Sequence, residues 1–492
     1  MSAGLPLAQH SLFEKLCPFT YTPLGARSMP YLYNTPEDQQ AMLEAIGAAS
    51  IDQLFDCVPA ELRRKSLLDL PPAMGELELT QHMMALAAKN VNVGQKTCFL
   101  GGGAYDHFVP AVVDALASRG EFYTSYTPYQ PEVSQGNLQV MFEYQTLICQ
   151  LTGMDVSNAS LYDGGSAAAE AVLLAMSVTG RSKVVVVGSV NPEYRQILET
   201  YFTCIGATLI TVPTPNGVAT PSEVAAVVDS ETACVLVQHP NFFGCLEDVP
   251  ALADVAHAAG ALLVQSFDPI SLGILKRPGD MGADVVVAEG QSLGTPLLYG
   301  GPYLGIMACK ESFVRRMPGR IAGQTTDRRG RRCWVLTLQT REQHIRREKA
   351  TSNICTNQGL FALRAAIYLT EVGPQGLAEV ADLCARKTEY ARQQIFSGSR
   401  LSAAFSAPVF KEFVVRDRDG HVSELIAAAS DAGILAGLPL GKWYPELDDC
   451  MLVAVTEKRT RAEIDALAAA LKGGTGSSIV PHAHTSLVGA PR

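Results

Sequence analysis

Tyrosines, prolines and polar side chains interleave between residues 123 and 136, which read YTSYTPYQPEVSQG. Each proline fixes its own φ and pushes the residue before it, Thr127 or Gln130, toward extended geometry, so we expect a stiff, irregular loop. Its phenol, hydroxyl and amide groups suit contact with a polar ligand or a partner surface. A surface loop anchored by half-buried tyrosines is an equally good interpretation of this stretch taken alone.

A second polar segment, residues 339–358, carries a cluster of cations: Arg341, His344, Arg347 and Lys349. These side chains could present fixed positive charge to a carboxylate or to an acidic partner. A solvated helix is the alternative interpretation. The end of the segment, ATSNICT at 350–356, is rich in β-branched and polar residues, which is unusual for a surface helix and favours a functional role.

Two further features could hold parts of a cofactor. Gly164, Gly165 and Ser166 open a predicted helix, where free backbone N–H groups and a hydroxyl could bind an anion. An ordinary glycine turn with a serine cap is the alternative interpretation and the commoner one. Asp268 follows a predicted apolar strand and could hold the protonated ring nitrogen of a cofactor, or cap a turn before Pro269.

Residues 290–294 follow another predicted strand and complete the layout of a fold type I pyridoxal phosphate (PLP) enzyme. That layout has a phosphate loop, an acid for the pyridine and a loop that carries a lysine. Ser292 stands where the lysine is needed, and no lysine occurs between Lys276 and Lys310. Because a Schiff base requires an amine, we interpret this pocket as vestigial and expect no cofactor in this chain. The vestigial residues are Gly164, Gly165, Ser166, Asp268 and Ser292.

Short apolar runs that alternate with helix-length connections must position these groups. The predicted strands are 184–187, 208–212, 234–237, 262–264 and 285–287, and the predicted helices include 193–202 and 249–259. This alternation predicts an α/β fold with a mostly parallel sheet and helices on both faces. Ligands of such sheets bind beyond the carboxyl ends of the strands, which is where Asp268 and Ser292 fall.

Changes in pattern along the chain predict four parts. Residues 1–80 read as an N-terminal helical arm, in which Thr35 can cap a helix that begins with Pro36. Residues 81–330 form a large PLP-transferase-like domain, and 331–472 form a smaller C-terminal α/β domain. The Gly-, Ser- and Pro-rich residues 473–492 are expected to be a flexible tail.

Composition excludes several classes of protein. The 492 residues are 47% hydrophobic and 18% charged, as in globular proteins. Net charge is −10, and no extended basic patch is present, so we expect no nucleic-acid partner. The twelve cysteines include no C-x-x-C pair, so we expect neither a metal site nor a disulfide framework. With no signal sequence and no apolar run of membrane-spanning length, we expect a cytoplasmic protein with no membrane contact.

Four segments together resemble one known family. YTPYQPEVSQG at 126–136, the run 339–358, AAAEA at 167–171 and YGGP at 299–302 are similar to the P-protein of the glycine cleavage system, glycine dehydrogenase (decarboxylating). More narrowly, the chain resembles subunit 1, the N-terminal half in bacteria with a split enzyme. The resemblance covers roughly residues 28 to 470, and its motifs are long and unusual.

The resemblance implies a division of labour between two chains. In this family the C-terminal half holds the cofactor, so PLP is expected on a partner, glycine dehydrogenase subunit 2, in an α₂β₂ assembly. It further implies that glycine is decarboxylated there, with the pyridinium ring as electron sink, and that the aminomethyl group passes to the lipoyl arm of H-protein. This chain would shape the shared site.

Site roles follow from the resemblance by residue type only. The loop residues Tyr126, Tyr129, Ser134 and Gln135 are expected to line the shared site. A second group is expected to buttress that site or to meet the partner subunit: Arg341, His344, Arg347, Lys349 and Asn353.

Two alternative functions stay open. The chain could be a self-sufficient PLP enzyme that uses another lysine, such as Lys310 or Lys349, although Lys310 precedes a helix-like segment and Lys349 lies in a basic run. It could also be a non-catalytic regulatory or scaffold homologue.

Overall fold

The computed structural model describes residues 33–64, 66 and 68–473. The chain forms two compact units, residues 1–88 and 89–492. Each is described by itself. The domain boundaries expected from the sequence remain predictions.

Within its described residues (33–64, 66 and 68–88), the first unit contains three short helices: α1 (Pro36–Ala45), the 3₁₀ helix η1 (Asp52–Phe55) and α2 (Glu76–Ala87). The Thr35 side chain accepts a hydrogen bond from Asp38 N, and the Asp38 side chain accepts one from Thr35 N, so the predicted cap of α1 is present as a capping box. No residue of the three helices is buried, which means that they form no core of their own.

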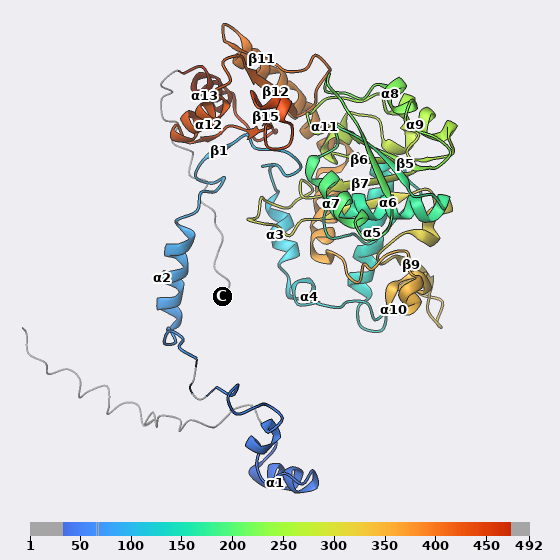
Figure 1. Cartoon of the computed structure of the whole chain (residues 1–492), viewed down its shortest axis with the longest axis vertical. Helices are drawn as coiled ribbons and strands as arrows, with labels where there is room; N and C mark the ends of the chain where they lie inside the picture. Colours follow the sequence, from blue (N-terminus) through green and yellow to red (C-terminus); the bar gives the residue numbers. More distant parts are fainter. Residues whose placement is uncertain (1–32, 65, 67, 474–492) are drawn as a thin grey trace, which may run out of the picture. The chain divides into compact units, whose positions relative to one another are not determined.

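The second unit is built on a seven-stranded sheet (Figure 1) with the order β2-β8-β7-β6-β5-β3-β4. Its strands are β2 (Val156–Ser157), β3 (Lys183–Val187), β4 (Thr208–Val212), β5 (Thr232–His239), β6 (Leu262–Phe267), β7 (Val285–Glu289) and β8 (Gly305–Cys309). The neighbouring pairs from β4 through β3, β5 and β6 to β7 are all parallel. All five predicted strands are confirmed.

β8 is a strand that the sequence pattern did not predict. It pairs antiparallel with β7 and follows the glycine-rich residues 294–305 directly, without a helical crossover. An antiparallel neighbour needs only a short return connection, so the βαβ alternation gives no signal for it. β8 is also fully buried.

Helices pack on the sheet and on one another around one large core. They are α3 (Ala111–Ala117), α4 (Gly120–Tyr123), α5 (Gln135–Thr152), α6 (Gly164–Thr179), α7 (Pro192–Phe202), α8 (Pro221–Ala225) and α9 (Val249–Ala258). Helix α6 contacts β5, β6, β7 and β8 and buries eleven of its sixteen residues. Its alanine-rich surface lets it lie close to the strands, which fixes its N-terminus at the carboxyl end of β7.

A hairpin and an irregular segment follow β8. The 3₁₀ helix η4 (Glu311–Arg316) leads to the antiparallel pair β9 (Ala322–Thr326) and β10 (Arg332–Leu336), which packs on α5. Three single-turn helices then cover most of 339–349: η5 (Gln339–Arg341), α10 (Gln343–Arg346) and η6 (Arg347–Lys349).

A long helix, α11 (Gly359–Phe396), connects this body to a second sheet. Its helical geometry is interrupted at Gly373, which has φ +60° and precedes Pro374. The part before this break and the turns just after it pack in the core of the large sheet, whereas Ala391 and Ile395 belong to the core of the second sheet. One helix therefore links two cores.

The second sheet, which we call the C-terminal sheet, has the order β11-β12-β15-β14 and is antiparallel throughout. Its strands are β11 (Leu401–Ala403), β12 (Glu412–Asp417), β14 (Leu438–Pro439) and β15 (Cys450–Ala454), and its helices are α12 (Val422–Asp431) and α13 (Arg461–Leu471). A short parallel pair joins β1 (Thr97–Cys98) to β13 (Ile434–Leu435).

Remaining short turns lie between these elements: η2 (Ile270–Gly273), η3 (Pro278–Met281) and η7 (Pro445–Leu447). Across residues 33–64, 66 and 68–473, no helix is both long and apolar enough to cross a bilayer.

Candidate functional site

The tyrosine loop lies between α4 and α5. Most of it is irregular, as predicted, but α5 begins at Gln135, so Ser134 is the N-cap residue and Gln135 lies in the first helical turn. The Ser134 side chain makes no capping hydrogen bond. The loop is thus anchored at both ends by helices, which limits how far its tyrosines can move.

A cleft of about 390 Å³ opens between this loop and the start of α11. Tyr126 and Tyr129 line one wall, and Thr356, Asn357 and Gln358 line the other. The two tyrosines differ sharply in their surroundings: the Tyr126 residue is 95% exposed, whereas the Tyr129 hydroxyl donates a hydrogen bond to Asn357 Oδ1 at 3.0 Å. Tyr129 therefore bridges the cleft, and Tyr126 is free to meet a partner or a ligand.

Gln135 and Ser134 face other surroundings. Gln135 Nε2 donates to the Trp334 carbonyl at 2.8 Å, and Trp334 N donates to Gln135 Oε1 at 2.9 Å. Gln135 thus pairs with β10 as a strand would and supports the loop from behind. Ser134 lies in an adjacent, more apolar groove of about 720 Å³ lined by α3, α5 and α11.

The segment 339–358 lies partly against the body. The Arg341 guanidinium donates to the carbonyls of Met317 and Gly319, and burial, with Arg320 nearby, lowers the pKa of Arg341 to about 10. His344 Nδ1 lies 3.3 Å from Arg320 Nη1. Arg341 and His344 therefore meet around residue 320, a position that no sequence motif marked.

Arg320 is the centre of this polar group. It forms an ion pair with the buried Glu342, donates to the Cys355 carbonyl at 2.9 Å and stacks over the Tyr129 ring at 4.9 Å from its centroid. It thereby ties the cation cluster to the tyrosine loop. The other predicted residues of this segment, Arg347, Lys349 and Asn353, are exposed and do not belong to the group around Arg320.

The sequence pattern missed Arg320, Glu342 and Asn357. Asn357 lies within the run that carried the resemblance, so its side chain was available as a candidate. Arg320 follows a Pro-Gly turn far from that run, and only the fold brings it to Tyr129.

The start of α6 differs from a free anion site. Asp163 and Ser166 form a capping box, which was the ordinary alternative for these residues. The Gly164 N–H donates at 3.0 Å to a carboxylate of this chain, Glu289 at the end of β7. A Cβ at Gly164 would collide with the Tyr194 hydroxyl and the Glu289 backbone, so close packing explains the glycine.

Asp268 and Ser292 lie at the carboxyl ends of β6 and β7, as predicted. Asp268 Oδ2 pairs with Lys411 Nζ at 2.6 Å, and Oδ1 accepts from Ile270 N at 3.0 Å. Ser292 is buried, and its hydroxyl makes no hydrogen bond with any described residue. The cavity between the ends of these strands measures only about 30 Å³.

Two further carboxyl groups line this small cavity. Burial raises the pKa of Glu289 to about 7, despite hydrogen bonds from three backbone N–H groups. Burial likewise raises the pKa of Glu412 to about 7; its carboxyl accepts from Gly102 N at 2.7 Å and from the Tyr105 hydroxyl at 2.8 Å. The pocket is thus acidic and largely occupied by its own hydrogen bonds.

Comparisons with known proteins agree over nearly the whole chain. The family model for the glycine cleavage system P-protein matches residues 29–471. "Probable glycine dehydrogenase (decarboxylating) subunit 1" of Desulforamulus reducens is 53% identical over 90% of this chain and 99% of its own length. The protein of the same name from Geotalea uraniireducens is also 53% identical, over 90% of this chain and all of its own length.

Solved structures agree with this relationship. A crystal structure of the glycine decarboxylase (P-protein) of the glycine cleavage system, in inhibitor-bound form, is 43% identical, with a TM-score of 0.80 over 90% of this chain and 99% of its own. The sphingosine-1-phosphate lyase of Burkholderia pseudomallei is 15% identical over 87% of this chain and 96% of its own, with a TM-score of 0.62, which shows the shared fold alone. The predicted fold type I architecture is confirmed, and the chain belongs to the glycine cleavage system P-protein family.

Proposed function

We propose that this chain is subunit 1 of a split glycine dehydrogenase (decarboxylating) of the glycine cleavage system. It acts with subunit 2 in an α₂β₂ assembly that decarboxylates glycine and transfers the aminomethyl group to the lipoyl arm of H-protein. Relatives named for this subunit match along 99–100% of their length, which supports the proposal. We further propose that the complex is cytoplasmic.

The observation that carries the division of labour is the residue after β7. Ser292, a buried serine, stands where a fold type I enzyme needs its Schiff-base lysine. We therefore assign PLP to subunit 2, where it supplies the electron sink for decarboxylation. This chain contributes surface and charge to the shared site.

The two rival lysines are poorly placed for a self-sufficient enzyme. Lys310 follows β8 and pairs with Asp284, which precedes β7, at 2.5 Å. Since β7 and β8 are antiparallel, this pair lies at the amino end of β7, opposite the end where ligands bind. Lys349 is exposed in a single-turn helix.

We propose that the 390 Å³ cleft is this chain's part of the shared site. Tyr126 and Tyr129 line it, Gln135 holds the loop at its junction with α5, and Ser134 lines the adjacent groove. His344 supports the cleft through Arg320, which stacks on Tyr129, and Arg341 bonds to the Met317 and Gly319 carbonyls just before Arg320. The exposed Arg347, Lys349 and Asn353 are assigned to contact with the partner subunit.

Reconstitution tests this function. The chain, purified alone and dialysed after exposure to PLP, is expected to stay colourless and to release no carbon dioxide from glycine. Addition of the lysine-bearing subunit, with lipoylated H-protein, should give glycine decarboxylation that neither subunit supports by itself. A stable absorption band from the chain alone, trapped by borohydride on one lysine, would instead establish the self-sufficient enzyme.

The scaffold alternative has a separate test. Shortening the loop at 126–136 removes the proposed wall of the shared site. If complexes that contain the shortened chain still assemble and decarboxylate glycine at the original rate, the chain is a scaffold. Loss of turnover in an assembled complex supports a role in the site.

A further inference from the structure

The end of the pocket where a cofactor phosphate would sit is already occupied by a carboxyl group of this chain. Glu289 accepts hydrogen bonds, each at 3.0 Å, from the backbone N–H groups of Gly164, Gln291 and Leu304. A phosphate needs such N–H donors, and it would have to displace a carboxylate or lie beside it. The Glu289 carboxyl already takes these N–H donors, and in its ionised form it would also repel a phosphate, so the start of α6 is closed to a phosphate.

The end where a pyridine ring would sit is occupied by a cation of this chain. Both oxygens of Asp268 are engaged, one by Ile270 N and the other by Lys411 Nζ. A protonated pyridine nitrogen would have to compete with the ammonium group for the same carboxylate.

Lys411 is held by more than Asp268. It is 1% exposed, its Nζ lies 3.3 Å from the centroid of the Tyr105 ring, and it donates to His107 Nε2 at 3.2 Å. An ammonium has only donors, so Nε2 must accept, and Nδ1 must carry the hydrogen that His107 donates to Glu457 at 2.6 Å. The network itself fixes the histidine tautomer.

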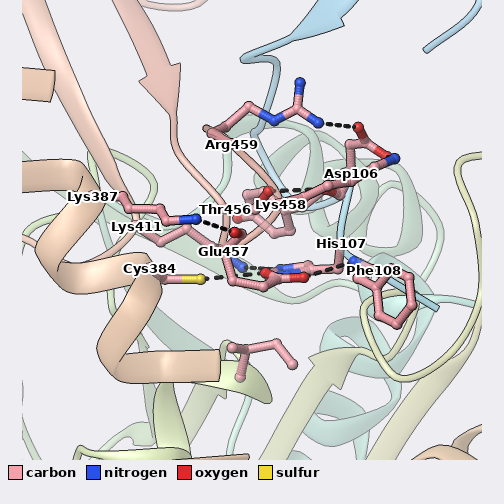
Figure 2. A network of polar contacts seen from close by, with 12 residues as sticks. Asp106, His107, Phe108, Cys384, Lys387, Lys411, Thr456, Glu457, Lys458 and Arg459 are labelled. Atoms are coloured by element: carbon pink, nitrogen blue, oxygen red, sulfur yellow. Dashed lines mark hydrogen bonds and ion pairs between the residues drawn. The ribbon is translucent and has the colours of Figure 1, made fainter. Parts of the chain in front are cut away.

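The network continues into α11 and the residues after β15. Figure 2 shows His107, Glu457 and Cys384 directed at one another, with Lys387 bonded to the Glu457 backbone. The Glu457 carboxyl accepts from His107 Nδ1 at 2.6 Å and from the Phe108 N–H at 2.7 Å. The three ligand-type side chains are thus joined by hydrogen bonds and end at an ammonium, which opposes a bound cation.

The space that remains is too small for a cofactor. A cavity of about 30 Å³ holds one or two water molecules, whereas pockets for small ligands typically measure roughly 300 Å³ or more. Its walls include Tyr105, Tyr194, Phe410 and the three carboxyl side chains described above. The residues present therefore do not fit PLP.

We propose that the fold type I pocket of this chain is closed to PLP by its own side chains, with Glu289 at the phosphate end and Lys411 at the ring end. The missing lysine at position 292 is only one of three barriers. This inference rests on the proposed function, in which the cofactor belongs to the partner. It goes further because it predicts that the lysine alone would not restore binding.

Binding of pyridoxamine 5′-phosphate to the full chain tests the pocket directly, because this ligand needs no lysine. Equilibrium dialysis is expected to show no saturable binding to the unaltered chain at millimolar ligand. Saturable binding with one site per chain would overturn the proposal. The measurement requires no substitution, so no folding defect can obscure it.

Ser292→Lys supplies the missing amine. With PLP and borohydride, peptide mapping is expected to show no more modification at position 292 than at exposed lysines. Circular dichroism and thermal melting establish that the variant is folded. Stoichiometric modification at position 292 would overturn the proposal, because the lysine would then be the only barrier.

Glu289→Ala and Lys411→Ala, added to Ser292→Lys, remove the other two barriers. We expect this triple variant to bind PLP at least tenfold more tightly than Ser292→Lys. The control adds Glu231→Ala and Lys276→Ala instead, which make the same charge change at exposed positions and should have no effect. A folded triple variant that binds no better than the control would overturn the roles of Glu289 and Lys411.

If the triple variant does not fold, the first two measurements decide the question. The proposed function is tested separately by decarboxylation in the reconstituted complex. A complex that is active even though the chain alone binds pyridoxamine 5′-phosphate would refute this inference and leave the function intact.

Discussion

At the scale of single residues, the buried charged side chains of this pocket are paired with other groups of the same chain. Lys411 is almost fully buried yet faces a carboxylate, an imidazole nitrogen and an aromatic ring. A buried ammonium is tolerated only when its surroundings replace water in this way. Removing the ammonium group should therefore destabilise the folded state, because its partners would stay buried without it.

We expect Lys411→Met to lower the free energy of unfolding by about 3–5 kcal/mol, because Asp268 is left with an uncompensated buried charge. Lys310→Met is the matched control: Lys310 pairs with Asp284, but its side chain is 43% exposed, so the expected loss is about 0–1 kcal/mol. Urea denaturation of both variants measures the difference. If the two variants lose the same free energy of unfolding, the Lys411–Asp268 pair stabilises the fold no more than an exposed ion pair does.

Glu170 on α6 offers a prediction for pH. Burial raises its pKa from 4.5 to about 7, although a hydrogen bond with Ser352 acts in the opposite direction. The folded state therefore holds a proton that the unfolded state has lost, and stability should fall as pH rises from 4.5 to 7. The expected contribution is about 3 kcal/mol between these limits.

Glu170→Gln keeps the size of the side chain and removes the titration. We expect the variant to match the original protein near pH 5 and to exceed it near pH 8. Urea unfolding across this range checks the sign. Stability curves that stay parallel would show that Glu170 titrates alike in the folded and unfolded states.

At the scale of elements, the cleft that we propose as part of the shared site depends on how α5, the β9–β10 hairpin and the start of α11 are joined. Gln135 pairs with the backbone of β10, and Tyr129 bonds to Asn357 just before α11. Each is a single side chain that fixes one segment on another. Loss of one of these side chains can therefore alter the shape of the cleft while α5 and α11 stay folded.

We expect Tyr129→Phe to reduce glycine decarboxylation by the complex about tenfold at most, because one hydrogen bond across the cleft is lost while the ring under Arg320 remains. Tyr390→Phe is the matched control, since that hydroxyl joins α11 to Asp465 in α13. Adding Gln135→Ala to Tyr129→Phe should reduce turnover further. Unchanged turnover in a folded double variant would remove both residues from the site.

At the scale of the whole second unit, two cores are joined by α11 and by the buried network around Lys411. The chain has two tryptophans, and they report on different regions: Trp334 lies with the hairpin and α5, and Trp443 lies beside the C-terminal sheet. We expect Trp334→Phe and Trp443→Phe variants to show coincident urea transitions, because the two regions unfold together. In a Lys411→Met background the two fluorescence transitions should separate. Coincident transitions in that background would show that α11 alone couples the cores.

The local pattern of the chain was enough to predict the strands β3 to β7, the helices between them and the cap of α1. Apolar runs of strand length and capping residues act over a few positions, so their signals are present in the sequence itself. The same pattern could not predict β8, whose antiparallel pairing depends on a partner strand, or the start of α5 at Gln135.

The sequence also allowed part of the pocket at the ends of β6 and β7 to be predicted. The absence of a lysine at position 292 is a fact of the sequence, and Asp268 could be placed at a strand end from the pattern alone. The partners of these residues were not visible. Lys411 lies far along the chain from both Asp268 and His107, as Glu289 does from Gly164, and only folding brings these groups within hydrogen-bonding distance.

What the sequence determined by itself was therefore the set of elements, the family and the missing amine, because each depends on residue type and short-range spacing. Only the tertiary structure decided what occupies the pocket and which cations reach the tyrosine loop. Those outcomes depend on distances between segments separated by more than a hundred residues, and on burial, which raises the cost of every unpaired charge. The pairing of Asp268 with Lys411 is one such outcome, and the stacking of Arg320 on Tyr129 is another.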